Sequence, residues 1–142
     1  MLVKAIKNNR TQLENSISMF AFGYDNSTEL LPITIGKKYI VSAVEVNRYG
    51  SFYLIVADDS EIDCTPWFYP SSFFEVIDSN SPNEWSKKEI KNYSIEGFKK
   101  IVDDDVFYQD LLDGNKVALK IYSLVYSEYA SFHNIDYVDR KT

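Results

Sequence analysis

The sequence predicts an α+β fold in which strands come first and helices second. Apolar side chains alternate with a period near two over residues 36–78, and tight turns interrupt the alternation. Residues 78–83, DSNSPN, have the composition of a linker. After this linker, apolar residues recur at the spacing of an α-helix. The separation of strands from helices along the chain is typical of the α+β class.

The alternating stretch divides into strands at residues that favour turns. Residues 37–46 are rich in β-branched side chains and predict a strand, and residues 51–57 predict its return. Between them, Asn47 and Gly50 tolerate a positive φ, which indicates a hairpin turn. Residues 58–60, DDS, predict a second turn because short polar side chains can bond their own backbone.

The rest of this stretch predicts a short third strand over residues 61–64, a bend over 67–72 and a closing strand over 73–77. Pro70 lacks an N–H and fixes φ, so we expect the ladder to be interrupted there. Short strands with tight turns, a bend and a last strand predict a small SH3-like β-barrel, which we place over residues 1–80.

The N-terminal segment is less regular. Residues 2–7 predict a first strand or the start of a helix, and residues 17–24, ISMFAFGY, predict a strand or a loop packed on the barrel. Pro32 indicates an edge or an extended lead-in before Gly36.

Residues 81–142 are predicted to form a helical extension that packs on the barrel. The first helix is expected over residues 94–102, with Ser94 as its N-cap. A second short helix is expected over 106–112, and a third, longer helix is expected from residue 117 onward.

Composition excludes several classes of function. The 142 residues are 45% hydrophobic and 15% aromatic, and their net charge is −6. Lysines occur in pairs but not in larger basic clusters, so we expect no binding to nucleic acid. The apolar runs are too short for a membrane span. A single cysteine fits a reducing compartment, and we expect a cytoplasmic protein.

An acidic cluster is the first candidate for contact with a partner. Asp58, Asp59, Glu61 and Asp63 lie close together after the predicted return strand. Such a cluster suits a basic partner, because complementary charge speeds association. The alternative is a solvated hairpin tip.

Aromatic residues form the second candidate. Tyr49, Trp67 and Tyr69 are expected near one groove, which would accept an extended peptide. The alternative is that these rings fill the core of the barrel.

Other polar residues favour structural roles. The run of aspartates at 103–105 lacks the spacing of a calcium loop, and it suits the positive N-terminal end of a helix. Cys64 is expected in a strand as a buried apolar residue, and a catalytic pair with His133 is not expected. The sequence therefore predicts no catalytic residue, metal or cofactor.

Several short motifs resemble a known group of proteins. The runs ITIGKKYIVSAVE, YLIVADDS, WFYPSSFFEVID and SPNEW are similar to those of small, acidic, uncharacterised bacterial proteins. Some of these proteins resemble immunity proteins found beside polymorphic toxins. The similarity covers residues 33–85, and it carries no active-site residue.

The resemblance and the charge together predict a non-enzymatic protein-binding protein, with an immunity protein that blocks a cognate toxin as the first hypothesis. An SH3-like module that binds an extended peptide is the alternative. An uncharacterised enzyme or regulator is the second alternative.

Overall fold

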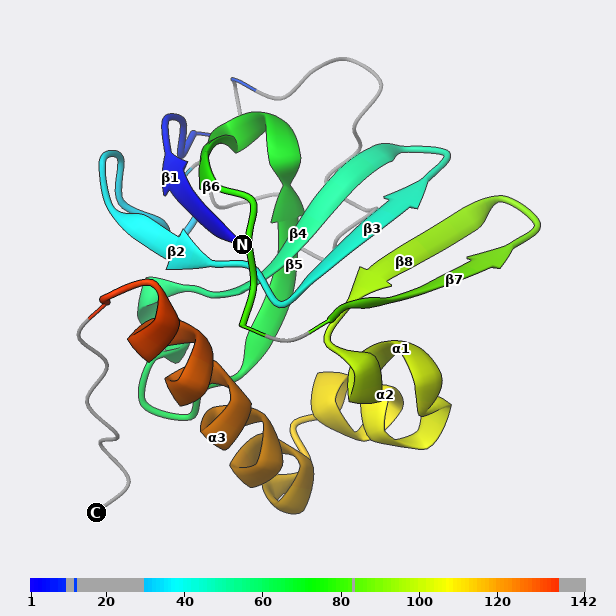
Figure 1. Cartoon of the computed structure of the whole chain (residues 1–142). Coiled ribbons are helices and arrows are strands. Elements are labelled where there is room, and N and C mark those ends of the chain that lie inside the picture. The colour runs from blue at the N-terminus through cyan, green and yellow to red at the C-terminus, as the bar shows by residue number, and fades with distance from the viewer. Residues whose placement is uncertain (10–11, 13–29, 83, 136–142) are drawn as a thin grey trace.

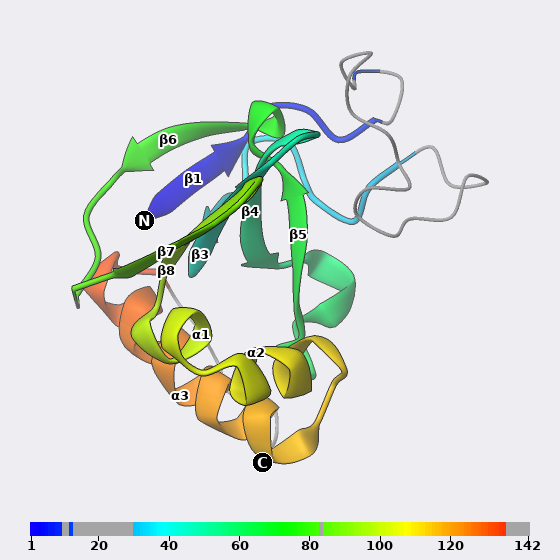
Figure 2. The same ribbon diagram turned by 90° about the vertical axis from the view of Figure 1, so that its right-hand side faces the viewer.

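The computed structural model describes residues 1–9, 12, 30–82 and 84–135. The predicted segment 17–24 lies outside these residues. The α+β class is confirmed: strands precede helices along the chain, and the helices gather on one side of the sheets (Figures 1 and 2).

The strands form two antiparallel sheets. The three-stranded sheet has the order β2-β1-β6, and the five-stranded sheet has the order β5-β4-β3-β8-β7. The sheets are not closed on each other by pairing between the described strands, so an SH3-like barrel is not confirmed. The strands are β1 (Leu2–Ala5), β2 (Lys38–Ile40), β3 (Ala43–Asn47), β4 (Gly50–Val56), β5 (Pro66–Pro70), β6 (Phe74–Asp78), β7 (Ser86–Ile90) and β8 (Tyr93–Gly97).

The strand predicted over residues 37–46 is divided between the two sheets. Val41 and Ser42 separate β2 from β3, and both are buried. The N–H of Ser42 donates to the carbonyl of Leu54 (3.1 Å), and the Ser42 hydroxyl shares a hydrogen bond with the Tyr122 hydroxyl (2.8 Å). Alternation along the sequence does not reveal this bend, because its partners are remote in the chain.

Of two other predictions near the second turn, the strand over residues 61–64 is wrong, and the bend over residues 67–72 is present but begins later than expected. Residues 61–64 form a turn rather than a strand, and Cys64 is buried there with a φ of 55°. Residues 66–70 form β5 and pair with β4, and the bend comes later, in the one-turn 3-10 helix η4 (Ser71–Phe73). Proline is tolerated in β5 because this strand is at the edge of its sheet.

The first predicted helix, over residues 94–102, is wrong in its first half and in its N-cap. Residues 94–97 belong to β8, which pairs with both β3 and β7. At Gly97 the strands approach so closely that a Cβ would collide with the Ser42 carbonyl and with Ala43. The expected helical extension from residue 81 therefore begins with a hairpin, and α1 (Lys99–Asp103) follows it.

The other two predicted helices are confirmed. Helix α2 (Asp105–Leu112) ends near Gly114, whose φ of 78° suits glycine. Helix α3 (Lys116–Phe132) begins at the N-cap Asn115, whose side chain accepts from the N–H groups of Val117 and Ala118. One buried face of α3 carries Tyr122 and Tyr129, which join core clusters with residues of the sheets.

Candidate functional site

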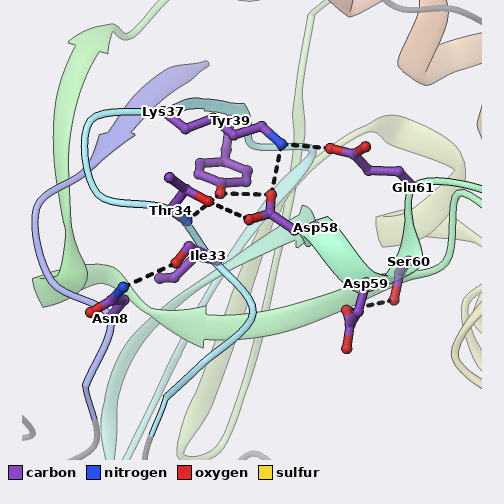
Figure 3. A network of polar contacts seen from close by, with 9 residues as sticks. All are labelled: Asn8, Ile33, Thr34, Lys37, Tyr39, Asp58, Asp59, Ser60 and Glu61. Atoms are coloured by element: carbon purple, nitrogen blue, oxygen red, sulfur yellow. Dashed lines mark hydrogen bonds and ion pairs between the residues drawn. The ribbon is translucent and has the colours of Figure 1, made fainter.

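The carboxylate of Asp58 lies at the centre of a polar network at the end of β4 (Figure 3). Asp58 begins the one-turn 3-10 helix η3 (Asp58–Ser60). Its Oδ1 accepts from the Tyr39 hydroxyl (2.9 Å) and from Lys37 Nζ (2.7 Å). Its Oδ2 accepts from the Thr34 hydroxyl (2.6 Å). Three donors from residues 34–39 therefore converge on one side chain.

Further bonds close this network from both sides. Lys37 also donates to Glu61 Oε1 (2.6 Å), and the Tyr39 hydroxyl accepts from the N–H of Thr34 (2.7 Å). The N–H of Asp58 donates to the carbonyl of Pro32 (2.9 Å). These bonds hold residues 58–61 against residues 32–39. We call residues 57–67, together with their polar contacts to residues 32–39, the anchored loop.

The electrostatics of the network keep its ion pair charged. Burial by itself would raise the pKa of Asp58, but hydrogen bonds from Lys37, Thr34 and Tyr39 lower it below the usual value. Burial would lower the pKa of Lys37, and the bonds to Asp58 and Glu61 outweigh that effect and raise it. Burial raises the pKa of Tyr39 to about 12. Asp58 and Lys37 are therefore both ionised at neutral pH.

The outer side of the anchored loop combines apolar and acidic side chains. Ile62 is 65% exposed and Trp67 is 36% exposed. Asp59 and Asp63 are exposed beside them in the chain. Ile35, on the segment that the network ties to this loop, is 55% exposed. Large apolar groups next to carboxylates on a fixed backbone are suited to contact with another protein.

The four predicted acidic residues divide into two pairs with different surroundings. Asp58 and Glu61 share the ammonium group of Lys37, which compensates one of their two negative charges. Asp59 and Asp63 are exposed, and Asp59 accepts a 3.2 Å hydrogen bond from the hydroxyl of its neighbour Ser60. The second pair therefore offers two exposed carboxylates to a partner, whereas the first pair is held in the network.

The predicted aromatic groove is not assembled. Tyr69 is 2% exposed and belongs to the core. Trp67 pairs with Ile55 near the end of β4, whereas Tyr49 precedes the start of that strand. At the rise of an extended chain this separation is roughly 20 Å. Trp67 therefore belongs with the anchored loop, and Tyr49 stacks instead with Arg48 in the turn before β4.

Sequence reasoning missed Thr34, Lys37 and Tyr39 as parts of the network. They lie 19 to 24 residues before the acidic residues that they contact. No local motif links them, and only the packing of the two sheets brings the two segments together. The exposed Ile35 and Ile62 were also missed, because exposure of a single isoleucine has no sequence signature.

The aspartates at 103–105 act as predicted at a helix N-terminus. Asp104 is the N-cap of α2, and its Oδ1 accepts from the N–H of Phe107 (3.0 Å). Asp105 accepts from Lys88 (2.8 Å), and Asp103 accepts from Ser86 (3.2 Å). The run thereby links α1 and α2 to strand β7.

A second polar cluster holds α2 against the sheet. Glu45 on β3 accepts from Asn47 (2.8 Å) and is hydrogen-bonded to Tyr108 of α2, which in turn is hydrogen-bonded to Tyr93 of β8. Burial raises the pKa of Glu45 above its usual value. The partners of Glu45 are an amide and a phenol, so the arrangement suits adhesion of the helix to the sheet.

His133 and Cys64 both lie in buried surroundings. His133 Nδ1 lies 3.5 Å from Asp78 Oδ2, and Cys64 is buried in the cluster beneath the helices. Within the described ranges, no group of three histidine, cysteine or acidic side chains is arranged to hold a metal ion. No helix in the described part of the chain is both long and apolar enough to cross a membrane.

Comparison of the chain with protein-family models, curated proteins and solved structures finds no match.

Proposed function

We propose that this chain is a non-enzymatic, cytoplasmic protein that binds another protein through the anchored loop, and that it acts as an immunity protein by blocking a cognate toxin. The observation that carries the proposal is the combination of a fixed backbone with exposed Ile62, Trp67, Asp59 and Asp63. The resemblance of residues 33–85 to proteins akin to immunity proteins supports the more specific role.

Preorganisation is the physical basis of the proposal. Ordering a loop when a partner binds costs free energy, and a loop that is already held loses less. Here the polar network fixes η3 through Asp58 and Glu61, and the exposed side chains of Asp59, Ile62 and Asp63 lie within or directly after this turn. Trp is among the residue types that dominate binding energy at interfaces, and a rim of carboxylates favours a basic partner.

The charge of the whole chain supports the same class of partner. The net charge is −6. Lys37 forms ion pairs with Asp58 and Glu61, whereas Asp59 and Asp63 are exposed to solvent. An acidic protein is attracted to a basic partner before contact, so association is fast at low salt and slower at high salt.

We also infer that strands β1 to β6 are related in arrangement to the SH3-like barrel predicted over residues 1–80. The support is the order of pairing: β6 with β1, β1 with β2, β3 with β4 and β4 with β5. The bend at Val41 and Ser42 connects β2 of the three-stranded sheet to β3 of the five-stranded sheet. A single 3-10 turn, η4, leads from β5 into β6.

The direct test is co-expression with the product of the neighbouring gene, followed by size exclusion and a growth assay. We expect a stoichiometric complex and protection of the cell from a toxic neighbour. The double variant Asp59→Lys with Asp63→Lys should lose both the complex and the protection. Circular dichroism should show that its fold is unchanged, because both residues are exposed.

A matched control changes the net charge equally at a distance from the loop. Glu84→Lys with Asp113→Lys reverses two exposed carboxylates, one just before β7 and one just after α2. This control should keep the complex. If both double variants bind equally well, the anchored loop is not the binding surface. If the neighbour is harmless and forms no complex, the immunity role is wrong.

A further inference from the structure

Among the described strands, β7 lies at an edge of the five-stranded sheet, and helix α1 contacts it. It pairs with β8 on one side, and it is the last strand in the sheet order. In Figure 2 it runs along the side nearest the viewer, and no other described strand or helix is drawn in front of it. Its sequence is Ser-Lys-Lys-Glu-Ile, and Lys87, Glu89 and Ile90 are exposed. An edge strand offers unpaired backbone groups to another strand.

The register identifies the residues whose backbone groups face outward. Ile90 pairs with Tyr93 across a two-residue turn, which makes them a hydrogen-bonded pair. Residues along an antiparallel strand bond alternately to one side and to the other. Lys88 and Ser86 therefore bond toward β8, and the N–H and C=O groups of Lys87 and Glu89 point to the open edge.

The charges of these outward residues are self-complementary. Antiparallel pairing of β7 with β7 of a second copy, about a twofold axis at Lys88, places Lys87 of each copy opposite Glu89 of the other. Opposite charges in directly facing positions stabilise a strand pair. Within one chain Lys87 and Glu89 form an exposed ion pair of 3.2 Å, with side chains 57% and 71% exposed, so both can turn to a new partner.

Two neighbouring registers are disfavoured by the same charges. An axis at Lys87 would place the two Lys87 side chains opposite each other, and an axis at Glu89 would do the same for the two Glu89 side chains. Like charges in facing positions destabilise a strand pair. The favoured axis does bring the two Lys88 residues together, but each is already paired with Asp105 of its own chain at 2.8 Å.

We propose that two copies of this chain associate through β7 and form one continuous ten-stranded antiparallel sheet. The interface contains four backbone hydrogen bonds, two for each facing pair of Lys87 and Glu89, and two ion pairs between the copies. This proposal is independent of the anchored loop.

The test is the mass of the full chain in solution at concentrations up to about 1 mM, measured by sedimentation equilibrium, because one strand pair gives weak association. The wild-type chain should reach twice its 16.5 kDa mass. In a dimer of either single variant, Lys87→Glu or Glu89→Lys, both facing pairs of positions 87 and 89 contain like charges. Each should raise the dissociation constant by about tenfold or more.

The deciding sample is an equal mixture of these two variants. In the mixed dimer one copy carries two glutamates at positions 87 and 89, and the other copy carries two lysines. Both facing pairs, 87 with 89 and 89 with 87, therefore join opposite charges. The mixture should therefore dimerise as the wild type does, although neither component does. Lys116→Glu, which makes the same charge change as Lys87→Glu but at the start of α3, should leave the dimer intact. A wild-type chain that stays monomeric, or a mixture that does not recover, would overturn the proposal.

Discussion

The chain carries two acidic runs, residues 58–63 and residues 103–105, and they use their carboxylates in different ways. In the first, Asp58 accepts from side chains that lie 19 to 24 residues earlier in the chain. In the second, Asp104 accepts from the N–H of Phe107, three residues later. One aspartate connects two remote segments, and the other completes the end of a helix.

The difference shows that the effect of an aspartate depends on what converges on it. A charged group with three donors is held by several strong hydrogen bonds, whereas a capping carboxylate has a single local partner. In both runs a neighbouring aspartate, Asp59 or Asp103, remains exposed. Anchoring and presentation of charge therefore fall to adjacent residues, and substitutions can separate the two roles.

The largest effect is expected for Asp58→Ala. This variant leaves Lys37, Tyr39 and Thr34 without their common acceptor, and hydrogen bonds to a charged group contribute about 1.5–3 kcal/mol. We expect the free energy of unfolding to fall by about 2–3 kcal/mol in urea denaturation. A loss no larger than that of Asp59→Ala would show that the network does not anchor the loop.

The contribution of Asp58 to the free energy of unfolding should also depend on pH. Its folded-state pKa is lowered, so its contribution is complete above its unfolded pKa and is lost as pH falls through the folded value. The test is the difference in free energy of unfolding between the wild type and Asp58→Asn, measured by urea denaturation between pH 7 and pH 3. The gap in stability should be constant near neutrality and shrink below about pH 4. A gap that grows on acidification would contradict the assigned ion pair.

A smaller effect is expected at the second run. Asp104→Ala removes the N-cap of α2 and should cost about 1 kcal/mol. Asp104→Asn keeps a side-chain oxygen in the same place, and asparagine is as good a cap. Thermal unfolding of both variants should show a lower midpoint for alanine and little change for asparagine. Equal losses would mean that charge, rather than capping geometry, matters at this position.

The smallest effects are expected for Asp59→Ala and Asp105→Ala. Asp59 is exposed, and the side chain of Asp105 is 80% exposed in its pair with Lys88. The free energy of unfolding of each variant in urea should lie within ~0.5 kcal/mol of the wild-type value. A clear loss at Asp59 would imply that it belongs to the network and is unavailable to a partner.

The sequence predicted the segments whose determinants are local. The turn at Asn47 and Gly50, the helix α2 with its aspartates and the helix α3 all depend on residues within one or two turns of the chain. The hairpin of β7 and β8 was missed because Ile95 fits a helical spacing with Phe98 and Ile101, while pairing with β3 decides the outcome.

The candidate site was predicted in part for the same reason. Its acidic residues are visible as a run, but their division into anchoring and exposed members depends on Lys37 and Tyr39, which reach them through the fold. Tyr69 could not be distinguished from Trp67 before the register of β5 was known. The two residues are two apart and point to the same face of β5, so alternation could not predict that Tyr69 is buried and Trp67 is exposed.

The most direct test of the proposed binding surface is hydrogen–deuterium exchange of the chain alone and in complex with the neighbouring gene product. Our account predicts added protection at residues 57–67 and 32–39, and little change in α3. Protection confined to α3 or to β6, with residues 57–67 unchanged, would contradict the claim that the anchored loop binds the partner.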